Sequence, residues 1–247
     1  MIPKVIHYCW FGNNPKNDTV EKCIKSWHKY CHDYEIIEWN ENNFNIKENS
    51  FVYEAYNAHK WAFISDYVRL KVLYEYGGIY CDADLEIIKN IDDLLEYCAF
   101  SGYQNVNEIP TGIMGAKSGN EWIKYLLSYY DNKHFICEKG YDMRTNVSII
   151  TEMTKLKYKI HLNNQRQIFG DSCLILPQDY LCAKNPRDGR INITNNTYAI
   201  HHFNGSWLDK DIKRKLIVRR FLNRLLGEGF TEKLYKLKEC IFKKMMK

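Results

Sequence analysis

The chain of 247 residues is long enough for one α/β domain with an appendage and a substantial hydrophobic core. Hydrophobic residues make up 45% and charged residues 26%, a composition that excludes a disordered, collagenous or coiled-coil protein. The net charge of +5 is uneven, because residues 208–247 carry 13 Lys/Arg and 5 Asp/Glu, a net +8, which leaves −3 for residues 1–207. The basic charge therefore belongs to a C-terminal tail.

The first half of the chain alternates strand and helix patterns. Apolar runs bounded by Gly, Pro and Asn indicate strands, and apolar residues at helical spacing after a capping Asp18 or Thr19 indicate a helix. The expected elements are strands over residues 4–10, 35–39 and 79–88, and helices over residues 20–30 and 52–76, the last stopped by Gly77 and Gly78. This order predicts an α/β domain with a mixed, mostly parallel central sheet flanked by helices, in which ligands bind beyond the carboxyl ends of the strands.

The second half of the chain has fewer clear patterns. Helices are expected over residues 120–130 and 147–156, and a short strand over residues 198–203 is followed by Asn204-Gly205-Ser206-Trp207. Beyond it, Leu, Ile and Phe are interspersed with Lys and Arg, which indicates basic amphipathic helices. We therefore expect a main domain over residues 1–207 and a basic helical tail over residues 208–247.

Two carboxylates stand two residues apart within the strand pattern over residues 79–88. In extended backbone Asp82 and Asp84 project from one face, and their mutual repulsion favours a bound cation. Oxygen donors of this kind suit Mg²⁺ or Mn²⁺, which also bind substrate phosphates. Many such pairs merely decorate a solvated turn, and the spacing alone favours that interpretation.

The preceding helix pattern contains a second charged pair. Asp66 and Arg69 are the only charges in the apolar stretch over residues 61–70, and their spacing places them on one side of a helix. Burying such a pair is costly unless further hydrogen bonds compensate, so the pair indicates either a site that meets a polar ligand or a salt bridge that only locks the helix to the sheet.

Together these residues resemble a known family. The run SDYVRLKVLYEYGGIYCDAD, residues 65–84, resembles the signature of glycosyltransferase family 32, the DxD-containing capsule and mannosyltransferase-like enzymes. It also resembles the catalytic domains of the large clostridial glucosylating toxins. The resemblance implies a GT-A type nucleotide-diphospho-sugar transferase fold, with residues 1–207 as the catalytic domain. It further implies a UDP- or GDP-linked sugar donor, Mn²⁺ or Mg²⁺, and retention of anomeric configuration.

The resemblance also implies roles for individual residues. Asp66 and Arg69 would contact the donor sugar and diphosphate, Asp82 the ribose, sugar or metal, and Asp84 would ligate the metal directly. Further donor contacts would come from Trp10, which can stack on the base, and from Asn146, Ser206 and Trp207. The closing segment over residues 201–207 offers His201 and His202 as metal ligands; alternation puts them on opposite faces of a strand, and His201 is favoured.

The function expected from this set is transfer of a hexose to a saccharide acceptor, free or lipid-linked, in bacterial-type surface or capsular polysaccharide synthesis. Front-face attack and double displacement both stay open, since no carboxylate is an obvious nucleophile. The rival interpretations are a metal-dependent phosphohydrolase or phosphotransferase that uses the same aspartates, and a non-catalytic nucleotide-sugar binding protein.

The basic tail and the cysteines indicate where in the cell the protein is expected to act. The tail either lies on an anionic membrane surface or packs on the domain with a solvated basic face. Nucleic acid is not an expected partner, because no recognised binding motif accompanies the charge. The nine cysteines form no C-x-x-C pair, and no charged leader or spanning apolar run is found. We expect a cytoplasmic protein with reduced thiols, either free or peripheral on the inner face of the membrane.

Overall fold

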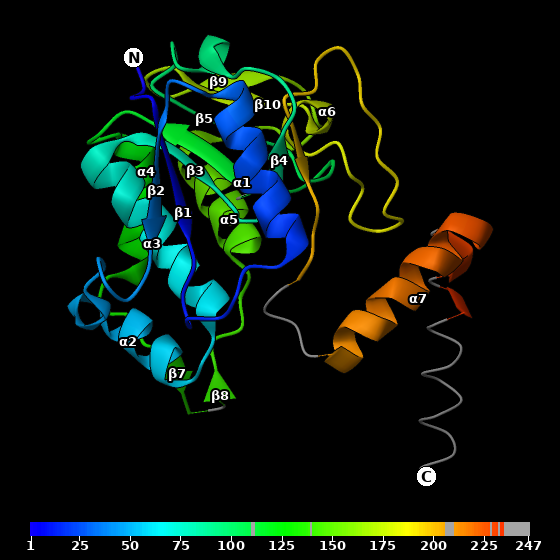
Figure 1. Cartoon of the computed structure of the whole chain (residues 1–247), viewed down its shortest axis with the longest axis horizontal. Coiled ribbons are helices and arrows are strands. Elements are labelled where there is room, and N and C mark those ends of the chain that lie inside the picture. The colour runs from blue at the N-terminus through cyan, green and yellow to red at the C-terminus, as the bar shows by residue number, and fades with distance from the viewer. Residues whose placement is uncertain (110–111, 139, 206–209, 228, 232, 235–247) are drawn as a thin grey trace. The chain divides into compact units, whose positions relative to one another are not determined.

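The computed structural model describes residues 1–109, 112–138, 140–205, 210–227, 229–231 and 233–234 (Figure 1). By its internal contacts the chain divides into two compact units. The first contains residues 1–183 and 193–202, and the second contains residues 184–192 and 203–247. Residues 184–192 thus group with the tail, and the catalytic-domain boundary expected at residue 207 stays a prediction.

The first unit is built on a seven-stranded sheet with the order β2-β1-β3-β6-β5-β10-β9. Its strands are β1 (Val5–Cys9), β2 (Glu35–Trp39), β3 (Gly78–Cys81), β5 (Ala99–Gly102), β6 (Ile113–Ala116), β9 (Gln167–Phe169) and β10 (Cys173–Leu176). The pairs β1–β2, β1–β3 and β5–β10 are parallel, whereas β6 runs antiparallel between β3 and β5, and β9 runs antiparallel to β10. Two small sheets pair β4 (Leu85–Ile87) with β11 (Ala199–His201) and β7 (Ile136–Cys137) with β8 (Gly140–Tyr141).

Helices lie against both faces of this sheet (Figure 1). The helices of the first unit are α1 (Asp18–Tyr30), α2 (Ser50–Asn57), α3 (Trp61–Tyr76), α4 (Glu121–Leu127), α5 (Asn146–Tyr158) and α6 (Gln178–Leu181). The second unit contains α7 (Lys210–Leu226). Alternation along β3 separates two cores, because Ile79 and Cys81 pack with Trp27 of α1 while Tyr80 packs with α3 residues. The predicted fold class, α/β with a mixed central sheet flanked by helices, is therefore confirmed. No helix in the described part of the chain is long and apolar enough to cross a bilayer.

The single long helix expected over residues 52–76 is wrong, because the chain forms two helices there. Between α2 and α3, His59 takes a left-handed φ of 54°, and the Lys60 amide donates back to the Ala55 carbonyl at 2.9 Å. A histidine in this conformation carries no Gly or Pro signal, so the pattern of apolar residues alone runs through the break. The cap of α1 also differs from expectation, since the side chain of Asn17 accepts from the amides of Thr19 and Val20.

The strand expected over residues 79–88 is interrupted at its acidic pair. β3 ends at Cys81, and residues 82–84 form a turn in which the Leu85 amide donates to the Asp82 carbonyl at 2.9 Å. The two carboxylates therefore do not project from extended backbone as the alternation argument assumed. The turn carries the chain from the main sheet into β4, which pairs antiparallel with β11.

Two glycines join α3 to β3, as the sequence predicts. Gly77 and Gly78 have φ values of 69° and 98°, and a Cβ on Gly78 would lie 2.7 Å from the Val5 carbonyl oxygen and 3.0 Å from Nε2 of His7. His7 is fully buried; its Nε2 lies 2.8 Å from the Gly77 carbonyl oxygen, and the Trp39 indole donates to its Nδ1 at 3.1 Å. Burial lowers the pKa of His7, so the neutral ring donates to Gly77 and fastens the end of α3 to β1.

We expect Gly78→Ala to destabilise the fold more than Gly119→Ala. Both glycines have positive φ, but a Cβ on Gly119 would meet no atom within 4 Å. The Gly119 variant thus reports backbone strain alone, about 1 kcal/mol, whereas the Gly78 variant adds a clash with backbone, for a total of about 2–4 kcal/mol. Urea unfolding of the two variants measures the difference, and equal losses would show that the Gly78 contact relaxes freely.

Candidate functional site

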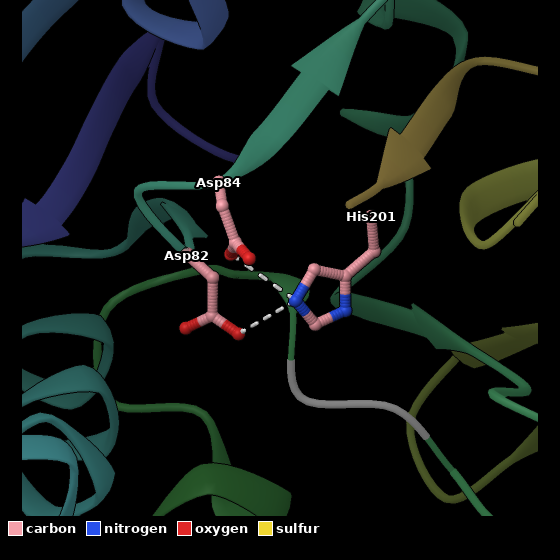
Figure 2. A group of neighbouring side chains, drawn as sticks. All are labelled: Asp82, Asp84 and His201. Atoms are coloured by element: carbon pink, nitrogen blue, oxygen red, sulfur yellow. Dashed lines mark ion pairs between the residues drawn. The ribbon is translucent and has the colours of Figure 1, made fainter. Parts of the chain in front are cut away.

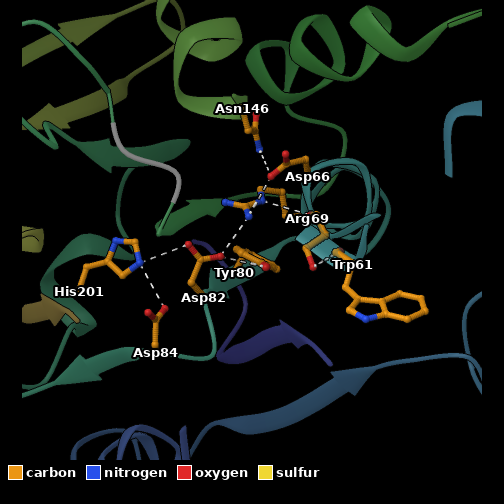
Figure 3. Close-up of polar contacts among 9 residues, drawn as sticks. Trp61, Asp66, Arg69, Tyr80, Asp82, Asp84, Asn146 and His201 are labelled. Carbon is orange, nitrogen blue, oxygen red and sulfur yellow. Dashed lines mark hydrogen bonds and ion pairs between the residues drawn. The ribbon is translucent and has the colours of Figure 1, made fainter. Parts of the chain in front are cut away.

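The candidate site lies beyond the carboxyl end of β3, where side chains from four segments of the chain meet (Figure 3). Asp66 and Arg69 come from α3, Asp82 and Asp84 from the turn after β3, Asn146 from the first turn of α5, and His201 from the end of β11. Eight of the 16 residues of α3 are buried, and Arg69 is the only charged residue among them. The structure therefore brings together residues that lie 135 positions apart in the sequence.

Arg69 is the centre of this arrangement. It is only 4% exposed, and its Nη2 lies 3.0 Å from Oδ1 of Asp82 and 3.2 Å from Oδ1 of Asp66. Its Nε donates to the Ser65 carbonyl at 3.2 Å, and its guanidinium carbon lies 4.5 Å from the centroid of the Tyr80 ring. Burial alone would lower the pKa of Arg69, but Asp82, Tyr80 and Asp66 outweigh burial and raise it, so the side chain stays charged.

Asp66 is the acid on the other side of Arg69. Burial raises its pKa to about 6, against the opposing effect of Arg69. Its Oδ1 also accepts a hydrogen bond of 3.1 Å from Nδ2 of Asn146. Asn146 is 4% exposed, and its own Oδ1 has no hydrogen-bond partner among the described residues. The pair thus presents a buried carboxylate and a buried amide oxygen that can accept hydrogen bonds from ligand hydroxyls.

Asp82, Asp84 and His201 form a second group (Figure 2), which lies next to Arg69 (Figure 3). Nε2 of His201 lies 3.2 Å from Oδ1 of Asp84 and 3.7 Å from Oδ2 of Asp82. Burial would lower the pKa of His201, but Asp84 and then Asp82 outweigh it and raise the pKa above its ordinary value. The Tyr80 hydroxyl donates to Oδ1 of Asp82 at 3.2 Å, so this carboxylate is shared between Arg69, Tyr80 and His201.

These three side chains fit a divalent cation. One ligand atom from each of Asp82, Asp84 and His201 lies within 4.8 Å of the others. Two carboxylate oxygens with one imidazole nitrogen make a donor set for a hard or borderline cation, whose remaining positions are commonly filled by water and substrate phosphate. The two negative charges beside His201 would be neutralised by such an ion.

The remaining predicted site residues stay predictions. His202 is not part of the group formed by Asp82, Asp84 and His201; its Nε2 lies 2.8 Å from Oε2 of Glu86. The Trp10 indole donates to the carbonyl of Asn14 at 2.7 Å, a contact within its own loop. Ser206 and Trp207 lie outside the described residues.

One contributor to the site, Tyr80, is missing from the residues predicted above. It could have been found, because it stands two residues before Asp82 and shares its side of the chain. Gly112 lies in a segment, residues 112–116, that the family resemblance associates with the donor-sugar pocket, but its contacts could not be predicted: its carbonyl accepts from the Asp82 amide at 2.7 Å, and a Cβ there would lie 2.8 Å from Nδ1 of His201. That close approach depends on tertiary structure and has no local signal.

Known proteins agree with this geometry. Residues 17–100 match the family described as "Glycosyltransferase sugar-binding region containing DXD motif", a range that includes Asp66, Arg69, Asp82 and Asp84. Residues 17–100 therefore belong to this sugar-binding region. The family resemblance predicted from the sequence is confirmed over residues 17–100, and the DXD motif of this region is the turn over residues 82–84.

Two relatives are mannosyltransferases by name. Inositol phosphoceramide mannosyltransferase 3 of Schizosaccharomyces pombe is 29% identical over 145 residues, which cover 54% of this chain and 40% of the relative. Inositol phosphoceramide mannosyltransferase 2 of the same organism is 23% identical over 240 residues, 93% of this chain and 65% of the relative. The chain thus spans less than two thirds of either relative. The structure described as PaToxG glycosyltransferase has a TM-score of 0.46 at 17% identity, over 63% of this chain and 70% of that one.

The raised pKa of Asp66 predicts a pH-dependent contribution to stability. The folded state holds the proton more tightly than the unfolded chain, so the contribution is fully present below about pH 4 and is lost as the pH rises through about 6. We expect the unfolding free energy of the wild type minus that of Asp66→Asn to fall by roughly 3 kcal/mol between about pH 4 and pH 7. Urea unfolding at a series of pH values measures this difference.

Asp142→Asn is the matched control with the opposite sign. Burial would raise the pKa of Asp142, but the Lys133 ammonium 3.0 Å away outweighs burial and lowers it. Its contribution to stability is therefore present above the unfolded pKa and lost as the pH falls. Parallel profiles for wild type and Asp66→Asn would contradict the assigned environment of Asp66.

The two adjacent histidines allow a direct test of the metal group. We expect His201→Ala to weaken Mn²⁺ binding by about tenfold or more, because it removes one of three protein ligands, while His202→Ala retains most of the affinity. Titration calorimetry, or the loss of free Mn²⁺ signal in electron paramagnetic resonance, measures both. Equal losses in the two variants would mean that the group formed by Asp82, Asp84 and His201 does not bind the ion.

Proposed function

We propose that the chain is a retaining glycosyltransferase that moves a hexose from a nucleoside-diphosphate sugar to an acceptor hydroxyl, with Mn²⁺ or Mg²⁺ as cofactor. The observation that carries this proposal is the shared carboxylate of Asp82. It pairs with the buried guanidinium of Arg69 and is also one of the three side chains, with Asp84 and His201, that could hold a cation, inside the region that matches the DXD sugar-binding family. Two sources of positive charge at one point suit a diphosphate leaving group.

In this proposal, different residues contact different parts of the sugar-nucleotide donor. Asp82, Asp84 and His201 would hold the divalent cation, which supplies Lewis-acid neutralisation of the diphosphate charge. Arg69 supplies a fixed positive charge to the same leaving group, and Tyr80 keeps both Arg69 and Asp82 in place. Asp66 and the Oδ1 of Asn146 accept hydrogen bonds from sugar hydroxyls. Trp10 would stack on the base, and Ser206 and Trp207 would close over the diphosphate.

For retention we propose front-face attack. The acceptor oxygen bonds to the anomeric carbon as the bond from that carbon to the phosphate oxygen breaks, and the acceptor proton passes to the departing phosphate. A double displacement needs a carboxylate free to attack the anomeric carbon. Asp66 is poorly suited to that role, because its Oδ1 is already engaged by Arg69 and Asn146.

The relatives suggest the sugar and widen the range of acceptors. Both are named mannosyltransferases of inositol phosphoceramide, which supports mannose as the hexose transferred here and a phosphoinositol lipid as one acceptor class. A saccharide acceptor, free or lipid-linked, in bacterial-type surface or capsular polysaccharide synthesis is the other. We propose a cytoplasmic location, which the buried thiols of Cys9, Cys23, Cys31 and Cys81 support.

A screen of UDP- and GDP-linked sugars for hydrolysis and transfer tests the proposal. We expect turnover with at least one donor, dependence on Mn²⁺ or Mg²⁺, and a loss of about 100-fold or more in kcat/KM for Asp84→Ala and for Arg69→Lys, which keeps the charge but loses the planar fork. Asp171→Ala serves as control, since this exposed aspartate precedes β10 at the opposite edge of the sheet.

Three outcomes would contradict the proposal in different ways. Full activity of Asp84→Ala in the presence of chelator would remove the metal from the mechanism. Release of phosphate from simple phosphoesters without a preference for sugar nucleotides would favour a phosphohydrolase. Donor binding by calorimetry without turnover on a broad acceptor panel would favour a binding protein.

A further inference from the structure

The second unit contains a helix that is hydrogen-bonded to its own unit on one side. α7 is fastened to residues 184–192 by Arg220, whose Nε donates to the Pro186 carbonyl at 3.1 Å, and by Asn223, whose Nδ2 donates to the Arg187 carbonyl at 2.7 Å. Arg190 donates in return to the Arg224 carbonyl at 3.1 Å. This side of the helix is occupied by its own unit.

The other side of α7 carries an exposed apolar stripe. Ile217, Phe221 and Leu225 recur every four residues and are 65%, 61% and 63% exposed, and Val218 beside them is 54% exposed. Isolated apolar side chains are common on protein surfaces, but a row of four along one helix face is a contiguous patch of the kind that marks an interaction surface. Phe230 and Leu234, which follow α7, are also exposed.

The charges around the stripe indicate what covers it. α7 contains seven Lys/Arg and a single acidic residue, Asp211. Arg214 is one turn before Ile217 and Val218, and Arg224 is one turn after Phe221; both are exposed, and Nη2 of Arg224 also donates to the Asp188 carbonyl at 3.3 Å. Cations therefore lie near both ends of the stripe. A second copy of the same face would bring like charges together, and a nucleic acid would leave the apolar row in water. An anionic bilayer surface satisfies both the apolar row and its basic border.

We propose that the α7 stripe, defined as Ile217, Val218, Phe221 and Leu225 with its border of Arg214 and Arg224, is a binding surface for bilayers that contain anionic lipid. The helix would lie in the plane of the interface, with the stripe among the acyl chains and the arginines at the headgroups. This inference does not depend on sugar transfer. If the proposed function holds, the surface brings the enzyme to lipid-linked acceptors.

Vesicle flotation with the full chain tests the surface. We expect the protein to float with vesicles in which a third of the phosphatidylcholine is replaced by phosphatidylserine, to remain largely unbound with phosphatidylcholine alone, and to dissociate as salt is raised from ~0.1 M to ~1 M. Ile217→Ser/Phe221→Ser/Leu225→Ser should lower the bound-to-free ratio by about tenfold or more. Arg214→Gln/Arg224→Gln should remove much of the preference for anionic lipid.

Three exposed apolar residues of the first unit allow a matched control with the same kind of substitution. Val106, Leu156 and Ile168 are 55%, 77% and 52% exposed, and their triple serine variant should bind vesicles as the wild type does. Circular dichroism and thermal midpoints check that each variant is folded. Donor hydrolysis in vesicle-free solution, measured in parallel, separates loss of membrane binding from loss of the enzyme's activity.

Two results would overturn the proposal. One is wild-type protein that fails to float with anionic vesicles, or that floats equally well with the stripe variant. The other is a wild-type dimer by light scattering that the stripe variant converts to monomer, because a second copy of the chain would then be the occupant.

Discussion

The candidate site depends on the buried guanidinium of Arg69. Arg69 is held between Asp66 and Asp82 and stacked against Tyr80, and its position fixes where both acids can lie. A guanidinium with so little exposure is stable only when carboxylates and carbonyls surround it, and each of those carboxylates would be costly without the guanidinium. The group therefore forms as a unit. Its removal would leave uncompensated charge in the core between α3 and β3, which is why we expect Arg69 variants to affect the site as a whole.

The same interaction connects the two halves of the site. Asp82 contacts Arg69 through Oδ1 and faces His201 through Oδ2, so the position of α3 is transmitted to the cation group through one side chain. The far side of that group is fixed separately. The Trp27 indole donates to the Leu85 carbonyl at 2.8 Å, and the His202 amide donates to the Asp84 carbonyl at 3.0 Å. β4 and β11 thus hold Asp84 and His201 near α1, while Arg69 of α3 holds Asp82. The three side chains that could bind a cation are therefore positioned from two separate parts of the fold.

Much of this arrangement follows from residue pattern, and the exceptions have physical causes. Asp66 and Arg69 could be predicted because two charges in an apolar helix must meet each other or a ligand. Strand alternation predicts that only one of His201 and His202 faces the site, and the preference for His201 came from the family resemblance. The turn at Asp82 could not be predicted, because apolar residues with a strand pattern stand on both sides of it. β4, which follows the turn, pairs with β11, a strand more than 100 residues later in the sequence. The break at His59 lacks the usual Gly or Pro signal. Nothing local to the sequence specifies the approach of Gly112 to His201.

Asp66 and Asn146 are held in positions that are unfavourable for the free protein. At neutral pH Asp66 is ionised in a buried place, and the Oδ1 of Asn146 is buried without a partner in the described chain. A structural salt bridge would need neither feature, because Arg69 already satisfies Oδ1 of Asp66. Both features are explained if a ligand with hydroxyl groups completes the hydrogen bonding, since an unsatisfied acceptor and a desolvated carboxylate gain most from donors that arrive without bulk water. The unpaired oxygen of Asn146 and the desolvated carboxylate of Asp66 therefore favour a polyhydroxylated ligand over a purely structural role for the pair.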